Sequence, residues 1–136
     1  ATGETVIFPI HPRTCQALKS AGIQPGPHVR LIEPVGYLDM LALEKYARLI
    51  LTDSGGVQKE AYMAAVPCIT LRRDTEWPET VAAGWNVLVG ADPARIREAV
   101  RTFHPLTEQP PLFGDGHAAQ HIAALCAALL EKHPLL

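Results

Sequence analysis

Short apolar runs alternate with amphipathic stretches along the chain, and residues typical of turns separate them. The apolar runs predict five strands, at residues 6–10, 28–32, 48–52, 67–71 and 86–89. Several of these runs are continuously apolar, which is typical of strands that are covered on both faces. Strand and helix alternate throughout, so the pattern predicts an α/β fold with a doubly wound, mainly parallel, Rossmann-like sheet.

The amphipathic stretches predict the helices. These are a helix from a cap at Thr14 through Ala21, Tyr37 to Tyr46 with its apolar side at Leu38, Leu41 and Leu43, Val57 to Ala65, a short helix from Pro78, a helix capped by Asp92 with Pro93 in its first turn, and Ala118 to Lys132. The last helix carries one apolar stripe, for which core packing is the expected role: Ile122, Leu125, Cys126, Leu129 and Leu130. The proline-rich residues 104–115 before it predict a surface connection.

Composition describes one globular domain. The chain has 136 residues, of which 48% are hydrophobic and 19% charged, with a net charge of −2. This charge gives no reason to expect a nucleic-acid or anionic-membrane partner. No apolar stretch is long enough to span a membrane, and the first residues do not resemble a signal peptide, so we expect a cytoplasmic protein.

Three widely spaced cysteines, Cys15, Cys68 and Cys126, lie in apolar or helical surroundings. Their odd number and spacing favour reduced, buried or half-buried thiols, and no metal-ligand spacing is present. The chain also begins without methionine and enters a strand almost at once. We interpret it as a piece of a longer polypeptide or a processed form.

The most informative segment is the turn after the third strand, Thr52 to Ala61. A helix that begins there has unpaired N–H groups and a positive dipole end, and Gly55 and Gly56 leave the backbone open to an anion. Glu60 follows one turn later and can accept the paired hydroxyls of a ribose. The alternative is an ordinary helix start, with Asp53 or Ser54 as the N-cap and Glu60 as a solvated acid of the first turn.

Polar or glycine residues follow three further strands. His11 follows the first, Gly36 and Tyr37 the second, and residues 72–79 the fourth. Ligands of parallel sheets bind at the carboxyl ends of the strands, so these residues are expected at one site. Arg72 can clamp phosphate and Glu76 can pair with it, whereas a charged loop of local ion pairs is the alternative.

Common nucleotide and hydrolase motifs are absent. There is no phosphate loop of a nucleoside triphosphatase, no Gly-x-Gly-x-x-Gly of a dinucleotide oxidoreductase, and Ser54 does not stand in a Gly-x-Ser-x-Gly nucleophile elbow. The sequence therefore predicts a phosphate-bearing ligand without assigning the ligand to one of these classes.

Four motifs together resemble the non-hydrolysing UDP-N-acetylglucosamine 2-epimerases. They are Phe8-Pro9-Ile10-His11-Pro12-Arg13, Pro34-Val35-Gly36-Tyr37-Leu38-Asp39, Leu51 to Ala61 and Thr75-Glu76-Trp77-Pro78-Glu79, and the resemblance spans about residues 5–132. It implies the C-terminal half of a two-domain enzyme with the glycosyltransferase-B-like fold. The whole chain, residues 1–136, would be the UDP-binding Rossmann-like domain without its first strand and helix.

The resemblance implies a role for each candidate residue. Ser54, Gly55 and Gly56 would hold the UDP diphosphate, Glu60 the ribose hydroxyls and Arg72 the phosphates. The backbone at Gly36 and Tyr37 would meet the uracil, and His11 would face the cleft and touch the substrate or a second, activating nucleotide sugar.

The family reaction inverts C2 of the sugar by eliminating UDP and adding it back, without a redox cofactor or metal. The carboxylates that move protons lie in the family's N-terminal domain, so the resemblance places no catalytic residue in this chain. It implies UDP, UDP-N-acetylhexosamine and the missing N-terminal domain as partners, and a homodimeric full-length enzyme. We expect the chain alone to bind UDP weakly and not to epimerise.

Three alternatives remain open. The motifs also resemble epimerases that act on UDP-2,3-diacetamido-2,3-dideoxyglucuronate. A glycosyltransferase of the same fold would differ by needing an acceptor. A non-catalytic UDP-sugar sensor would bind the nucleotide without turning it over.

Overall fold

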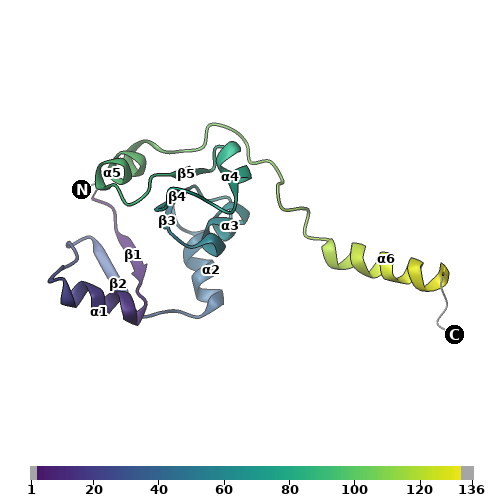
Figure 1. Ribbon diagram of the computed structural model, residues 1–136, viewed down its shortest axis with the longest axis horizontal. Helices are drawn as coiled ribbons and strands as arrows, with labels where there is room; N and C mark the ends of the chain where they lie inside the picture. The colour runs from purple at the N-terminus through teal and green to yellow at the C-terminus, as the bar shows by residue number, and fades with distance from the viewer. Residues whose placement is uncertain (1–2, 133–136) are drawn as a thin grey trace.

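The computed structural model describes residues 3–132. Strands and helices alternate from β1 to β5, and two consecutive helices close the chain (Figure 1). The elements are β1 Val6–Pro9, α1 Pro12–Ser20, β2 Val29–Ile32, α2 Tyr37–Lys45, β3 Ile50–Thr52, α3 Gly55–Met63, β4 Cys68–Thr70, α4 Pro78–Ala82, β5 Asn86–Leu88, α5 Pro93–Thr102 and α6 Ala118–Lys132. This order confirms the predicted α/β class.

The strand pairing is parallel throughout but is divided between two sheets. β1 pairs with β2, in register from Val6 opposite Val29 to Pro9 opposite Ile32. β4 lies between β3 and β5, with Cys68 opposite both Ile50 and Asn86. Within residues 3–132, no ladder joins β1 to β3, so the structure has two parallel sheets where the sequence pattern predicted one.

The three-stranded sheet carries the core, with helices on both faces. Because successive strand residues point to opposite faces, Cys68 packs toward α3 while Ile69 packs toward α5. The α3 side gathers Ile50, Ala61, Val66 and Cys68. The α5 side gathers Ile69, Val89 and Ala99, with half-buried neighbours that include Ile96 and Phe103. This layering fixes α3 against the carboxyl end of β3.

The helix α1 begins earlier than predicted. His11, not Thr14, is its N-cap: the His11 Nδ1 accepts a hydrogen bond from the Arg13 N–H at 3.2 Å. Pro12 suits the first helical position because its missing N–H would have no helical acceptor there. The predicted cap at Asp92 and the bounds of α6 are confirmed. Of the two caps that an ordinary helix start offered for α3, Asp53 and Ser54, the structure has Ser54.

The helix α6 does not pack into the core, contrary to the prediction for its apolar stripe. Figure 1 shows it projecting away from the other elements at the end of the long connection. Leu125 is 65% exposed, and Ile122, Leu129 and Leu130 are similarly open. Cys126 is exposed as well, which corrects its expected burial, whereas Cys68 is buried and Cys15 half-buried.

The helix α2 also differs from its predicted pattern. Leu38 was expected on the apolar side but is exposed, and the buried residue of the helix is Glu44, at 2% exposure. Both carboxyl oxygens of Glu44 are without a hydrogen-bond partner in the described part of the chain. Burial, and secondarily the Glu60 carboxylate, raises the pKa of Glu44 to about 7.

Candidate functional site

The N-terminus of α3 follows the carboxyl end of β3 directly. Ser54 is the N-cap, and its Oγ accepts from the Val57 N–H at 3.5 Å, while its own N–H donates to Thr52 Oγ1 at 3.0 Å. Gly55 and Gly56 form the first helical positions, and within residues 3–132 their N–H groups have no protein acceptor. Two free donors and the positive end of the helix dipole make this turn suited to bind an anion.

The loop after β4 lies beside this turn. A Cβ placed on Gly55 would come 2.9 Å from Glu76 Oε2 and 3.8 Å from Trp77 Nε1. A side chain at position 55 would therefore displace the Glu76 carboxylate from its observed place against the start of α3.

Arg72 in this loop is held by two carboxylates. Its guanidinium donates to Asp74 Oδ1 at 2.9 Å and to Glu76 Oε1 at 2.8 Å. The pKa of Glu76 is lowered, first by the hydrogen bond from its own backbone N–H and then by Arg72. Arg72 thus pairs with Glu76, which both the phosphate clamp and its alternative, a loop of local ion pairs, allow. The guanidinium is therefore held beside Glu76, the loop residue that lies against Gly55.

A buried polar network, which the sequence did not reveal, fixes the loop to α3 and the sheet. Gln58 Oε1 accepts from Thr75 Oγ1 at 2.6 Å and from Asn86 Nδ2 at 3.2 Å. Asn86 also donates to Thr80 Oγ1 and accepts from Thr70 Oγ1. All of these polar residues except Thr75 are buried. Polar residues within short apolar strands, as at Thr70 and Asn86, were the available sign of this network.

The Lys59 ammonium lies over two aromatic rings, those of Trp77 and Phe113. Its Nζ is 4.6 Å from the centroid of Trp77 and 4.8 Å from that of Phe113, and these rings meet edge-to-face. Phe113 belongs to the proline-rich connection, which Tyr62 also contacts through its hydroxyl and Pro110 O at 2.6 Å. The connection therefore helps to order the loop instead of serving only as a surface link.

The remaining predicted residues lie at other strand ends. His11 follows β1 and is exposed, and Gly36 and Tyr37 follow β2 at the start of α2, where Tyr37 is 65% exposed. In residues 3–132, no hydrogen bond joins any of these three residues to the turn at Ser54. Glu60 is half-buried on α3, close enough to Glu44 to affect its pKa. The structure thus brings together Ser54, the two glycines and the Arg72 loop.

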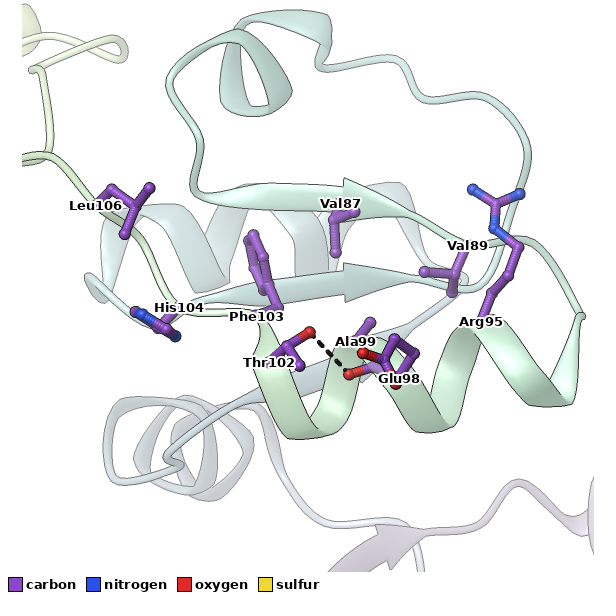
Figure 2. A pocket seen from close by; sticks show the side chains of 9 residues that line it. All are labelled: Val87, Val89, Arg95, Glu98, Ala99, Thr102, Phe103, His104 and Leu106. Carbon is purple, nitrogen blue, oxygen red and sulfur yellow. Dashed lines mark hydrogen bonds between the residues drawn. The ribbon is translucent and has the colours of Figure 1, made fainter.

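A separate groove of about 470 Å³ lies between β5 and α5 (Figure 2). Val87, Val89 and Phe103 line it, and Leu106 lies at one end. Arg95 also lines it, but its guanidinium donates to Leu88 O at 2.9 Å. The groove runs along β5 and α5. Its apolar lining does not suit a phosphate.

Comparison with known proteins shows the family to which the chain belongs. The sequence model of the family described as UDP-N-acetylglucosamine 2-epimerase matches residues 2–127. The chain belongs to the UDP-N-acetylglucosamine 2-epimerase family.

Among the members of this family, a UDP-N-acetylglucosamine 2-epimerase homolog from Methanococcus maripaludis is 48% identical over 126 residues, which cover 89% of this chain and 35% of the relative. The UDP-2,3-diacetamido-2,3-dideoxy-D-glucuronate 2-epimerase of Pseudomonas aeruginosa is 46% identical over 126 residues, covering 91% of this chain and 35% of that enzyme. The chain therefore spans about a third of the length of these relatives.

A crystal structure of an epimerase of the family shows the same fold. The UDP-GlcNAc 2-epimerase of Methanocaldococcus jannaschii, in complex with UDP-GlcNAc and UDP, matches with a TM-score of 0.77 and 44% sequence identity. The match covers 91% of this chain and 36% of that one. The glycosyltransferase-B-like, Rossmann-type architecture expected from the sequence is confirmed by such neighbours.

Proposed function

We propose that this chain is the nucleotide-binding part of a UDP-N-acetylglucosamine 2-epimerase, which converts UDP-GlcNAc to UDP-ManNAc. The observation that carries the proposal is the α3 N-terminus, where Gly55 and Gly56 present free N–H groups beside the Arg72 loop. The relative from Methanocaldococcus jannaschii, which is 44% identical, was crystallised with UDP-GlcNAc and UDP.

Each predicted residue has a role in this proposal. Ser54, Gly55 and Gly56 bind the diphosphate, and Glu60 accepts hydrogen bonds from the ribose hydroxyls. Arg72 contacts the phosphates. The exposed positions of Tyr37 and Gly36 at the start of α2 suit contact with the uracil, and the exposed His11 suits contact with substrate across the cleft.

The turn would also assist the chemistry. Elimination breaks the anomeric C–O bond and leaves negative charge on UDP. Preorganised N–H donors at a helix terminus oppose that charge as it develops. The proton transfers require carboxylates from the N-terminal domain, so we expect no turnover by this chain alone. Measurable epimerisation of UDP-GlcNAc by the 136-residue chain would contradict this expectation.

We further propose that the first strand and helix of the domain come from residues outside this chain. Doubly wound sheets commonly have the strand order 3-2-1-4-5-6. The observed pairings β2-β1 and β3-β4-β5 match this order when one strand is inserted between β1 and β3. Apolar side chains on both facing strands support the insertion, since Phe8 and Leu51 are each 40% exposed. The inserted strand would join the two sheets into one.

The sugar is the least constrained part of the proposal. The relative from Pseudomonas aeruginosa is named as acting on UDP-2,3-diacetamido-2,3-dideoxy-D-glucuronate, and it is nearly as similar as the homolog from Methanococcus maripaludis. This similarity supports a 2,3-diacetamido glucuronate as the second candidate. Both substrates share the UDP group that the turn at Ser54 would bind.

The cellular compartment and the oligomeric state of the full-length protein are also proposals. Cys15, Cys68 and Cys126 are all free thiols, which supports a reducing compartment such as the cytoplasm. No helix within residues 3–132 is long and apolar enough to cross a membrane. The homodimer that the family resemblance implies stays a prediction.

Calorimetric titration of the chain with UDP tests the proposal. We expect saturable binding and a rise in melting temperature with UDP, because a ligand that binds only the folded state stabilises that state. An absence of heat and of any melting shift at millimolar UDP would contradict it.

A further inference from the structure

The side chain of Trp77 contacts Gly55, the first residue of α3. The indole Nε1–H donates to the Gly55 carbonyl at 2.8 Å. Gly55 and Gly56 have no side chains to anchor them, and glycine has the greatest backbone freedom of all residues. The hydrogen bond from Trp77 therefore restrains the backbone at Gly55, which has no side chain of its own to hold it in place.

The geometry of the peptide bond passes this restraint to Gly56. The Gly55 carbonyl and the Gly56 N–H belong to one planar peptide unit, and in a trans peptide they point in opposite directions. Because Gly55 is the first residue of α3, its carbonyl points along the helix and the Gly56 N–H points out of the N-terminal end, and the bond from the indole holds the peptide unit in that orientation. That N–H is one of the two free donors at the helix terminus.

Trp77 is itself fixed from several sides. Its backbone N–H donates to Thr75 Oγ1 at 2.9 Å, and its carbonyl accepts from Thr80 Oγ1 at 2.8 Å. The Lys59 ammonium lies over the indole, and the ring of Phe113 packs edge-on with 5.5 Å between centroids. The indole is therefore preorganised before any ligand arrives.

We propose that Trp77 is a positioning residue for the UDP diphosphate, which it serves by orienting the Gly55–Gly56 peptide so that the Gly56 N–H faces a phosphate oxygen. This inference rests on the proposed function of the turn. It predicts that loss of the indole N–H weakens the binding of the phosphates and leaves the binding of the nucleoside unchanged.

The test uses Trp77→Phe in the 136-residue chain, with Trp85→Phe as the matched control. Trp85 is also a half-buried tryptophan, but its buried Nε1 has no partner in the described part of the chain. For Trp77→Phe we expect about five-fold weaker UDP binding by calorimetry, the usual effect of one lost hydrogen bond. Uridine affinity should not change. For Trp85→Phe we expect both affinities to equal those of the wild type.

Backbone order at Gly56 gives a second, ligand-free measurement. The ¹H–¹⁵N heteronuclear NOE of the Gly56 amide should fall in Trp77→Phe and not in Trp85→Phe. If the Phe substitution prevents folding, Phe113→Leu removes the ring that supports the indole, and a smaller fall in the same NOE is expected.

Two failures can be told apart. An unchanged Gly56 NOE, or equal weakening of UDP and uridine binding in Trp77→Phe, would overturn the role of Trp77. If the wild-type chain binds no UDP, the proposed function of the turn fails, and the Gly56 NOE alone then decides whether Trp77 orients the peptide.

Discussion

The Glu76 carboxylate occupies the space next to Gly55: a Cβ on that glycine would lie 2.9 Å from Glu76 Oε2. The atom it would meet is the end of a flexible side chain, so Glu76 can move aside. The position is intolerant of a side chain only if an anion must also fit there.

Gly55→Ala should therefore separate stability from binding. Alanine in the first turn of a helix is favoured over glycine by up to about 1 kcal/mol, so we expect an unchanged or slightly higher free energy of unfolding in urea. UDP binding should be lost, because the methyl group obstructs the approach of the phosphate. Gly26→Ala, at a position with open space around it, serves as the control and should bind UDP normally. Normal UDP binding by Gly55→Ala would argue against a phosphate at this turn.

Glu76→Gln should strengthen UDP binding. Arg72 is paired with both Asp74 and Glu76, and removal of one negative charge leaves the guanidinium freer to meet a phosphate. Exposed ion pairs are weak, so we expect a gain of at most about five-fold in affinity, which high salt should reduce. Glu79→Gln in the same region is the charge-matched control. Weaker binding by Glu76→Gln would mean that the carboxylate supports the site instead of competing for Arg72.

Glu44 should make the stability of the chain fall as pH rises toward neutrality. Burial raises its pKa from 4.5 to about 7, so between these values the folded state holds a proton that the unfolded state has released. The stability is present below pH 4.5 and is lost as pH rises through about 7, by about 3 kcal/mol if the whole shift is expressed.

Urea unfolding of Glu44→Gln at pH 5 and pH 8 checks this account. The substitution should remove most of the pH dependence, whereas Glu108→Gln at an exposed position should keep it. The same slope in wild type and Glu44→Gln would contradict the assigned cause.

The thiols should differ sharply in reactivity. Burial raises the pKa of Cys68 to about 11, whereas Cys126 is exposed on α6. We expect a thiol reagent at pH 8 to modify Cys126 rapidly and Cys68 only on unfolding. Mass spectrometry of the labelled peptides measures this, and Cys126→Ser should remove the fast reaction. Rapid labelling of Cys68 in the native chain would contradict its burial.

The local elements were largely predictable because local chemistry determines them. The caps at Ser54 and Asp92 and the apolar strands such as Cys68–Thr70 follow from turn residues and hydrophobic runs. The cap at His11 was missed because histidine is an uncommon capping residue and Thr14 is a common one.

Features that depend on tertiary packing were not predictable in the same way. An apolar stripe on α6 is the same in sequence whether a core covers it or not, and here it is exposed. The periodicity of α2 gave no sign that Glu44 would be buried. The bond from Trp77 to Gly55 joins residues 22 positions apart, and no local pattern encodes such a distance. The division into a β1-β2 sheet and a β3-β4-β5 sheet likewise depends on pairing between strands, which the sequence of a single strand does not encode.

A ¹H–¹⁵N correlation spectrum of the chain, recorded during titration with UDP, tests the central claim most directly. If the α3 N-terminus binds the diphosphate, the amide signals of Gly55 and Gly56 will show the largest shifts, and those along the groove between β5 and α5 will stay in place. Shifts confined to the groove at Val87 and Phe103, or unchanged signals at Gly55 and Gly56 at saturating UDP, would contradict the account.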